Sequence, residues 1–369
     1  MAAQLTAPPV VRRHAVFHDL RVAEVAPLTA DSVTITFAVP AELAEEYSFV
    51  QGQHVSLRCR PAGDEVRRNY SICSPVGSGL LRVAVKKLPG GVFSSYAHGQ
   101  LRAGDVIEVL TPTGRFNTPL DVDAARTYVA IAAGSGITPI LSIIATILEV
   151  EPRSSVTLLY GNRTMQDIMF LEDLEDLKNR ALNRFSMSCV LSREQQEAEL
   201  LNGRIDRAKL ERFCTTILPA AVDEWFICGP QAMINEARAF LAERGVDSRH
   251  VHAELFHAQG QERPAEAAPQ RGGVADGAAQ VTVVLDGRAS TFALDPNGER
   301  ILDAALRVRS DAPFACKGGV CGTCRARVLQ GAVTMEQNYA LEQSEVDAGF
   351  VLACQSHPAA AAVTLDFDQ

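Results

Sequence analysis

Four cysteines near the C-terminus have a spacing that can bind an iron–sulfur cluster. Cys316, Cys321 and Cys324 lie in one loop at the spacing C-x4-C-x2-C, and Cys354 follows further along the chain. Two ferric ions bridged by sulfide need four soft thiolate ligands, and this spacing is typical of [2Fe–2S] centres. Glycines between the ligands let backbone N–H groups approach the sulfurs. The sequence therefore predicts a centre that moves single electrons.

A structural zinc site is the alternative for these cysteines. Zinc ribbons usually carry two C-x2-C pairs that close one tetrahedron. The second C-x2-C pair is missing from this sequence. The iron–sulfur cluster is therefore the preferred interpretation.

The bulk composition excludes several classes of protein. A chain of 369 residues is expected to form two or three domains, and its formal charge of −9 argues against a nucleic-acid partner. The sequence contains no apolar run of membrane-spanning length, and residues 1–13 lack a signal-peptide pattern. We therefore expect a cytoplasmic protein with no membrane partner.

The sequence predicts three modules and a linker, preceded by a disordered N-terminus at residues 1–14. Residues 15–120 contain short alternating strands between glycine and proline turns, which favour an antiparallel β-barrel. Residues 121–256 alternate apolar strands with helices, which is typical of an α/β domain with a parallel sheet and nucleotide-binding crevices. Residues 257–279 have few bulky apolar side chains and predict a flexible linker. Residues 280–369 predict a small α+β unit around the cysteine loop.

A glycine-rich turn follows the predicted strand at residues 128–132. Its sequence is Gly134-Ser135-Gly136-Ile137-Thr138-Pro139, and a helix is predicted to begin there with Thr138 as N-cap and Pro139 in the first position. Such a turn and the helix dipole can hold a pyrophosphate. A tight connection without a ligand is the alternative, because the full G-x-G-x-x-G fingerprint is absent.

A second candidate site lies in the predicted barrel. Arg68, Tyr70 and Ser71 place a cation, an aromatic face and a hydroxyl within one short strand. A flavin can use these groups for its phosphate, its isoalloxazine ring and its polar edge. An ordinary strand with Tyr70 in the core is the alternative. The loop from Gly90 to Ser94 could supply N–H groups to the same phosphates, or be a plain loop.

Five motifs in register resemble those of the ferredoxin–NADP reductase superfamily. They are Arg68-x-Tyr70-Ser71, Gly91 to Ser94, Ala133 to Pro139, Tyr160-Gly161-Asn162-Arg163 and Cys228-Gly229-Pro230. With a plant-type [2Fe–2S] module at the C-terminus, the chain resembles the reductase components of oxygenases from about Phe17 onward. The resemblance implies a multidomain protein with an antiparallel flavin-binding β-barrel, an α/β parallel-sheet NAD(P)-binding domain and an α+β ferredoxin domain of β-grasp type.

The resemblance also implies roles for individual residues. Arg68 would pair with the phosphate of FAD, Tyr70 would lie against the flavin ring, and Ser71 would touch its polar edge. The residues that would hold the FAD pyrophosphate are Gly91, Val92, Phe93 and Ser94. Those that would hold the nicotinamide dinucleotide are Gly134, Ser135, Gly136, Thr138, Pro139, Asn162, Arg163, Cys228, Gly229 and Pro230. The hydride path would pass Cys228, Tyr70 and Phe256. For Phe256 the alternative is ordinary packing at the end of the domain, and for Cys228 it is a role as a small core residue.

The choice of coenzyme is predicted from the end of the strand at residues 186–191. Ser192 and Arg193 follow it, and in superfamily members that use NADPH a Ser-Arg pair at this place binds the 2′-phosphate. The resemblance therefore implies NADPH rather than NADH, with Arg163 as a second candidate for the contact. Hydride transfer to a flavin needs no acid or base, so no catalytic residue of that kind is expected.

The implied function is that of an NAD(P)H-dependent oxidoreductase. A hydride carries two electrons and the cluster accepts one, so FAD would stand between NADPH and the [2Fe–2S] centre. The expected partner is the oxygenase of a multicomponent monooxygenase, namely a di-iron enzyme that epoxidises phenylacetyl-CoA in phenylacetate catabolism. A Rieske-type aromatic or steroid hydroxylase is the alternative acceptor. A flavin and iron–sulfur redox sensor is a third hypothesis, against which the complete nicotinamide site argues.

Overall fold

The computed structural model describes residues 15–61, 63–256 and 277–369. The chain divides into two compact units, of which one is Phe17–Ala265 and the other contains Glu266–Gln369. The N-terminal segment 1–14 lies outside the described residues, and so does the predicted linker 257–279 except for its last three residues.

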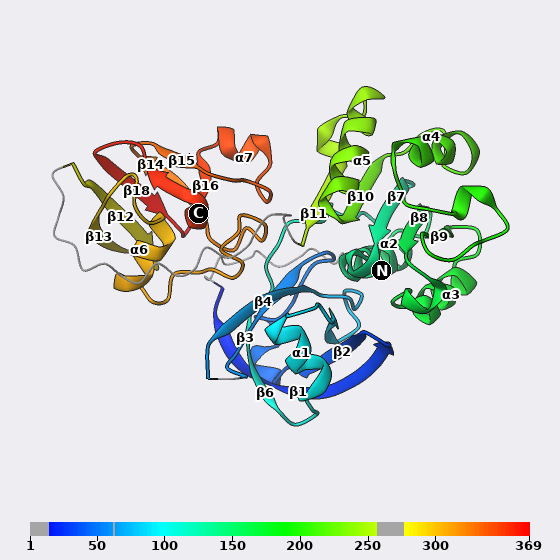
Figure 1. The fold of residues 1–369 in the computed structure, drawn as a ribbon, viewed down its shortest axis with the longest axis horizontal. Coiled ribbons are helices and arrows are strands. Elements are labelled where there is room, and N and C mark those ends of the chain that lie inside the picture. The colour runs from blue at the N-terminus through cyan, green and yellow to red at the C-terminus, as the bar shows by residue number, and fades with distance from the viewer. Residues whose placement is uncertain (1–14, 62, 257–276) are drawn as a thin grey trace. The chain divides into compact units, whose positions relative to one another are not determined.

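The first module is a closed antiparallel barrel (Figure 1). Its six strands are β1 (Phe17–Thr29), β2 (Ser32–Ala38), β3 (His54–Cys59), β4 (Val66–Ser71), β5 (Leu81–Lys86) and β6 (Val106–Leu110), in the order β4-β3-β6-β1-β2-β5. A bridge between Ile72 and Val83 joins the two ends of this order, so the sheet closes on itself. Helix α1 (Val92–Gly99) adds Phe93 and Ala97 to the barrel core.

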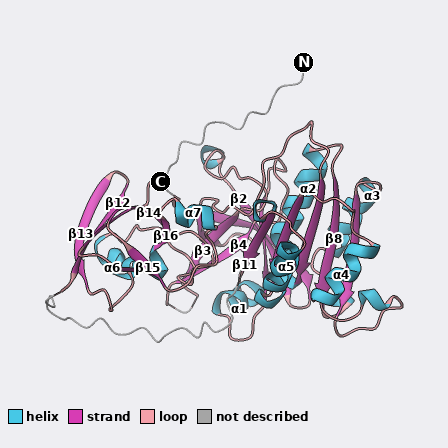
Figure 2. Ribbon diagram, turned by 90° about the horizontal axis from the view of Figure 1, so that it is seen from above, coloured by secondary structure: helices cyan, strands magenta, loops and turns pink. Residues whose placement is uncertain are grey.

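The second module is a parallel sheet covered by helices on both faces (Figure 2). Its strands are β7 (Thr127–Ala133), β8 (Ser155–Asn162), β9 (Phe185–Leu191), β10 (Glu224–Gly229) and β11 (Val251–Leu255), in the order β11-β10-β7-β8-β9. Its helices are α2 (Ile137–Val150), α3 (Leu171–Arg180), α4 (Arg207–Thr216) and α5 (Gln231–Glu243). The chain reverses its direction of travel across the sheet between β7 and β10, which makes their carboxyl ends the expected ligand crevice.

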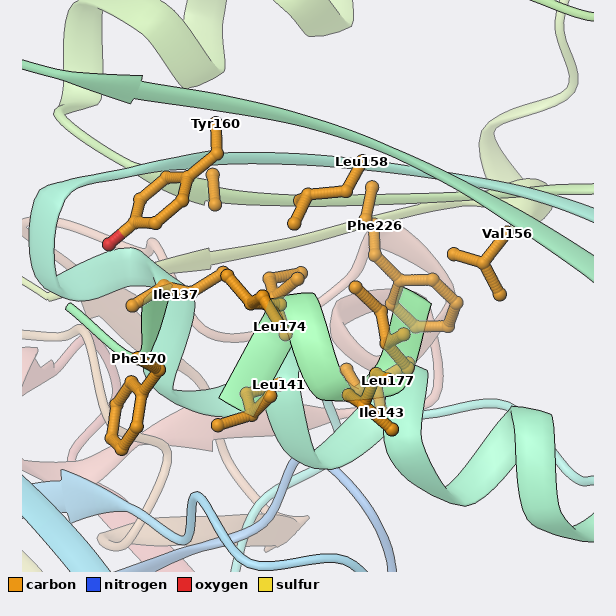
Figure 3. Packing of buried hydrophobic residues seen from close by; sticks show 14 of the residues in the cluster. Ile137, Leu141, Ile143, Val156, Leu158, Tyr160, Phe170, Leu174, Leu177 and Phe226 are labelled. Carbon is orange, nitrogen blue, oxygen red and sulfur yellow. The ribbon is translucent and has the colours of Figure 1, made fainter. Parts of the chain in front are cut away.

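The core of the parallel sheet lies between its strands and the helices α2 and α3 (Figure 3). Leu158 and Phe226 from the sheet pack with Ile137 of α2 and Leu174 of α3. Continuous apolar strands and an almost wholly buried α2 make this layer hydrophobic throughout, as expected for a parallel sheet. The carboxyl ends of β7 and β10 are thereby fixed on a rigid layer.

The barrel and the parallel sheet belong to the same compact unit, and α2 joins them. The hydroxyl of Ser142 on α2 donates to the carbonyl of Ser74 at 2.8 Å, and the hydroxyl of Thr146 accepts from the N–H of Val76 at 3.1 Å. Barrel residues Cys73 and Ala84 are also part of the core that α2 forms. The strand that carries Tyr70 and the helix that follows the glycine-rich turn are therefore held in one geometry.

The start of α2 differs from the prediction, so Thr138 is not the N-cap. The helix begins at Ile137 after a 3-10 turn at Gly134–Gly136, with Gly136 in the N-cap position. Gly134 adopts a φ of +53°, which only glycine does readily, and winding therefore starts earlier than the sequence suggested. Thr138 lies in the first turn, where its hydroxyl donates to Ser135 O at 3.0 Å.

The C-terminal unit is a mixed sheet packed on a helix. Its strands are β12 (Ala279–Leu285), β13 (Arg288–Leu294), β14 (Arg325–Gln330), β15 (Val333–Met335), β16 (Phe350–Leu352), β17 (Ser356–Pro358) and β18 (Ala362–Asp366), and its helices are α6 (Ile301–Val308) and α7 (Gln343–Asp347). The main sheet has the order β13-β12-β18-β14-β16, in which β12 and β18 are parallel. Strands β12 and β13 form a hairpin whose turn residues Asp286 and Gly287 both have positive φ. Within the described residues, no helix has the length and apolarity needed to span a membrane.

Candidate functional site

Strand β4 carries the residues predicted to meet a flavin. Side chains alternate along a strand, so Arg68 and Tyr70 lie on one face and Ser71 on the other. Arg68 is exposed and donates to Arg67 O at 2.7 Å, while Tyr70 is partly buried and packs on Phe93 with ring centroids 5.2 Å apart. Burial raises the pKa of Tyr70, so its phenol stays neutral. The face thus presents a cation beside an apolar ring.

The loop before α1 offers backbone groups rather than side chains for a contact with a ligand. Gly91 is the N-cap of α1, and the first N–H groups of a helix have no partner within the helix. The side chain of Phe93 is 1% exposed and fills the barrel core. The hydroxyl of Ser94 is occupied, since it accepts from Leu88 N at 3.1 Å and donates to Gly91 O at 3.2 Å. Any contact to a pyrophosphate here is therefore made by N–H groups.

Three side chains from separate elements meet beside the carboxyl end of β10. Ser71 Oγ donates to Glu254 Oε2 at 3.2 Å, and His54 Nδ1 lies 3.9 Å from Glu254 Oε1. Cys228 is fully buried, and burial raises the pKa of its thiol well above the ordinary value, with the charge of Glu254 adding to the shift. The thiol of Cys228 is therefore neutral at physiological pH.

Glu254 and His54 were not among the predicted site residues. Glu254 is the second-last residue of β11, two positions before Phe256, and His54 begins β3. The one signal in the sequence is a carboxylate directly before the apolar pair Leu255 and Phe256. Phe256 itself packs against the core that contains Cys228, which is compatible both with a place beside a flavin and with ordinary packing.

The carboxyl ends of β7 and β10 touch through their backbones. A Cβ atom on Gly136 would lie 2.2 Å from Cys228 O, and a Cβ on Gly229 would lie 3.1 Å from the Cβ of Ala133. A Cβ on Gly134, in contrast, would meet nothing within 4 Å. The glycines thus allow a close contact between the two strand ends, next to an open surface at the start of α2. Such a cradle fits a pyrophosphate and a flat ring.

The ends of β8 and β9 carry the residues predicted for the adenosine half. The N–H and the hydroxyl of Ser192 both donate to Asn162 O, at 3.0 and 3.2 Å, and Arg193 N donates to Arg163 O at 2.8 Å. Asn162 is 8% exposed, and its side-chain amide makes no hydrogen bond of normal geometry in the described part of the chain, although it interacts weakly with the hydroxyl of Tyr160. A buried amide with so weak a partner is a group that a bound ligand can satisfy.

Arg163 and Arg193 differ in how their charges are compensated. The guanidinium of Arg163 binds Asp167 and also lies 3.1 Å from Asp31 on the barrel, and Asp31 in turn lies 3.4 Å from Lys86. Arg193 is exposed, and its guanidinium makes no ion pair or hydrogen bond with the residues that the structure describes. Arg193 is therefore the better placed of the two to receive a phosphate.

The four cysteines of the C-terminal unit form two pairs. The thiols of Cys316 and Cys321 interact directly, and so do those of Cys324 and Cys354. These contacts, burial and the neighbouring sulfurs raise the pKa values of Cys316 and Cys324. Four sulfurs this close repel one another as thiolates, and positively charged metal ions between them would stabilise the thiolate forms.

Two sulfur pairs suit a two-iron cluster better than one zinc ion. A structural zinc ion needs four ligands that converge on one point. A [2Fe–2S] centre needs two thiolates for each iron. Backbone N–H groups also point at sulfur, from Gly318 to Cys316 at 3.3 Å and from Thr323 to Cys321 at 3.5 Å. The donor set fits the cluster.

Comparison with known proteins places all three modules. The oxidoreductase FAD-binding domain matches residues 19–118, the oxidoreductase NAD-binding domain matches residues 130–239, and the 2Fe-2S iron-sulfur cluster binding domain matches residues 283–359. The chain is 46% identical to one of the subunits of 1,2-phenylacetyl-CoA epoxidase of Escherichia coli (strain K12), over 95% of this chain and 98% of that protein. It is 33% identical to the ferredoxin reductase component of 3-ketosteroid-9-alpha-monooxygenase of Mycobacterium tuberculosis (strain H37Rv), over 95% of this chain and 96% of that protein. The chain belongs to the family of oxygenase reductases.

A solved structure shows the same fold for a reductase of this type. Phthalate dioxygenase reductase, described as a modular structure for electron transfer from pyridine nucleotides to [2Fe–2S], superposes with a TM-score of 0.57 and 22% identity. The superposition covers 95% of this chain and 98% of that one. The predicted resemblance, the three-module fold and the cofactors FAD, a nicotinamide dinucleotide and a [2Fe–2S] cluster are thus confirmed. The oxygenase reductase is an NAD(P)H oxidoreductase that transfers electrons.

Proposed function

We propose that this oxygenase reductase takes electrons from NADPH and delivers them to the oxygenase of a phenylacetyl-CoA epoxidase. The observation that carries the proposal is the 46% identity to a component of the Escherichia coli epoxidase along nearly the full length of both chains. The lower identity of 33% to the ketosteroid monooxygenase component supports a steroid hydroxylase as the second candidate partner. A cytoplasmic location is part of the proposal and is supported by nine cysteines that are all unpaired thiols or cluster ligands.

The residues of the site bind and orient the cofactors. Bound flavin would supply the conversion between a two-electron hydride and single electrons. Arg68 and the N–H groups at the start of α1 hold its phosphates, and Tyr70 packs against its ring. Ser71 presents a hydroxyl at the ring edge, and its hydrogen bond to Glu254 fixes the orientation of that hydroxyl.

The nicotinamide half is placed by the contact between β7 and β10. The glycine turn at residues 134–136 receives the pyrophosphate, and Cys228 and Gly229 form the floor under the nicotinamide. The neutral thiol of Cys228 adds no charge where a hydride must pass. Asn162 and Arg193 bind the adenosine half, and no side chain is required to transfer a proton.

Replacement of Arg193 by alanine is expected to weaken the binding of NADPH more than that of NADH. A charge-assisted contact to the 2′-phosphate contributes about 1.5–3 kcal/mol, which corresponds to roughly tenfold to a hundredfold in affinity. The Michaelis constant for NADPH should therefore rise by that factor, while the constant for NADH changes little. Steady-state reduction of ferricyanide with each coenzyme measures both constants.

Arg163→Ala is the matched control for this coenzyme test. Its guanidinium is held by Asp167 and Asp31, so its loss should change the two Michaelis constants to a similar and smaller extent. Equal increases of the Michaelis constants for NADPH and NADH in Arg193→Ala would refute the assignment of Arg193 to the 2′-phosphate. An unchanged NADPH constant in that variant would transfer the 2′-phosphate contact to Arg163.

Reconstitution with oxygenase subunits tests the proposed partner. The purified reductase is mixed with the oxygenase subunits of phenylacetyl-CoA epoxidase, phenylacetyl-CoA and NADPH, and the epoxide is measured. Product is expected at a rate that depends on the amount of reductase. A parallel reaction with the oxygenase component of the ketosteroid monooxygenase and its steroid should give little product. The reverse outcome, from a reductase that still reduces ferricyanide, would favour the steroid hydroxylase.

A further inference from the structure

Gln355 is a buried amide directly after the fourth cysteine of the C-terminal unit. It is 1% exposed and lies in the short 3-10 segment Ala353–Gln355. Its Nε2 atom lies 2.9 Å from Lys317 O, 2.8 Å from Cys354 O and 3.7 Å from Cys354 Sγ. All three neighbours can accept a hydrogen bond and none of them is a good donor. The amide therefore presents its NH2 group to them, and the flipped orientation is disfavoured.

The first of these acceptors belongs to a residue with an unusual backbone. Lys317 has a φ of +52°, a left-handed conformation that is unfavourable for residues with a side chain. This conformation turns the loop immediately after Cys316, and the next N–H, that of Gly318, points at Cys316 Sγ at 3.3 Å. The hydrogen bond from Gln355 to Lys317 O helps to hold that turn.

The loop is fixed from a second side as well. Gly319 has a φ of +75°, and a Cβ atom there would lie 3.1 Å from Gln355 Cγ and 3.2 Å from Gln337 O. The carbonyl of Gly319 accepts from Tyr339 N at 3.0 Å. The missing side chain at residue 319 thus makes room for the stem of Gln355. The loop with three cysteines is held between Gln355 and the backbone at residue 339.

We propose that Gln355 is a positioning residue of the [2Fe–2S] site with two effects. It fixes the loop that carries three ligands against the segment that carries the fourth, and it directs an N–H at Cys354 Sγ. A hydrogen bond to a ligand sulfur stabilises the more negative, reduced state of a cluster, so Gln355 raises the reduction potential. This inference rests on the proposed assignment of the four cysteines as cluster ligands.

Two substitutions in the full-length protein test the two effects. Gln355→Glu keeps the shape but turns an oxygen toward two carbonyl oxygens and a sulfur, so the cluster should be released to an iron chelator roughly tenfold faster or more. Gln355→Met keeps the volume without an N–H or a charge, so its cluster should have a lower midpoint potential and a release rate between those of the unmodified protein and Gln355→Glu. Release is followed by the loss of visible absorbance, and the potential is measured by redox titration of the electron paramagnetic resonance signal.

The control for charge is Gln330→Glu. Gln330 is exposed at the end of β14, so the same change of charge there should leave both the release rate and the potential near those of the unmodified protein. If Gln330→Glu released its cluster as fast as Gln355→Glu, the local contacts of Gln355 would be rejected in favour of a general effect of charge.

A rescue variant tests the link to Lys317. Lys317→Gly removes the strain at φ +52°, so the double variant with Gln355→Met should release its cluster as slowly as the unmodified protein, yet keep the lowered potential. A merely structural role for Gln355 predicts that both properties recover together. An unaltered potential in Gln355→Met would overturn the role of Gln355. A cluster that survives loss of a ligand cysteine would instead overturn the ligand assignment.

Discussion

Replacement of Cys321 by serine is expected to abolish the [2Fe–2S] cluster and leave the flavin half of the enzyme working. Cys321 is paired with Cys316, and a serine hydroxyl is far less acidic than a thiol, so it is a much weaker ligand for a sulfide-bridged iron than a thiolate is. Iron content should fall from about two per chain toward zero. Ferricyanide should still be reduced by NADPH, because the flavin barrel and the parallel sheet form a separate compact unit. Electron delivery to the oxygenase should be lost.

Cys214→Ser is the matched control for the cluster variant. Cys214 lies partly buried on α4 and is not a predicted ligand, so its serine variant should keep both iron and electron delivery. Iron and labile sulfide analysis, together with epoxide formation by the reconstituted oxygenase, measures the contrast. A Cys321→Ser protein that retains its iron, or a native protein that contains zinc in place of iron and sulfide, would contradict the cluster assignment.

The parts of the site that were predicted from the sequence are those whose signals are local. Three cysteines in one loop, a strand that ends in Gly134-Ser135-Gly136, and Arg68-x-Tyr70-Ser71 each place several chemical groups within a few residues. Short-range backbone geometry then keeps those groups together in any fold that contains the segment. The modules themselves were predictable for the same reason, because strand alternation and continuous apolar strands are properties of single segments.

The parts that were missed depend on contacts between distant segments. Glu254 becomes a site residue only because β11 brings it to Ser71, 183 positions earlier in the chain. Asp31, 132 positions before Arg163 in the chain, binds the guanidinium of Arg163 in addition to Asp167, which follows four positions later. Spacing cannot reveal either pair, since an isolated carboxylate in a sequence is usually solvated.

The helix start at α2 illustrates a different limit of sequence reasoning. Thr138 followed by Pro139 is a good N-cap pattern, yet Gly134 can adopt a positive φ and start the winding earlier. The N–H groups of the glycine turn are then offered to a ligand from a 3-10 turn rather than from an extended loop. The Thr138-Pro139 pattern and the glycine turn each favour a different helix start. The packing of Ile137 into the core favours the earlier one.

Gly136→Ala is expected to slow reduction of the flavin by NADPH on the order of a hundredfold. Gly136 has a φ of −60°, so alanine is allowed by the backbone and the effect is purely steric. Its Cβ would lie 2.2 Å from Cys228 O and 2.5 Å from Cys228 C, which are main-chain atoms that no rotamer can move aside. The end of β10 would have to shift by about 1 Å, and a displacement of that size at a reacting centre costs roughly a hundredfold in rate. Stopped-flow bleaching of the flavin absorbance measures the step directly.

The comparison with Gly99→Ala decides whether this loss arises at the nicotinamide. A Cβ on Gly99, the last residue of α1, would meet nothing within 4 Å, so that variant should reduce its flavin at the unmodified rate. FAD content should be unchanged in both variants, because the residues proposed to hold FAD lie on the barrel and not on the strand end that moves. A thermal unfolding curve of Gly136→Ala shows the temperatures at which the variant is folded. Flavin reduction is measured at one of these temperatures, so that a slow rate does not result from unfolding. Flavin reduction at the unmodified rate in Gly136→Ala would mean that hydride does not pass at the contact of β7 with β10, and Cys228 would then be only a buried core thiol.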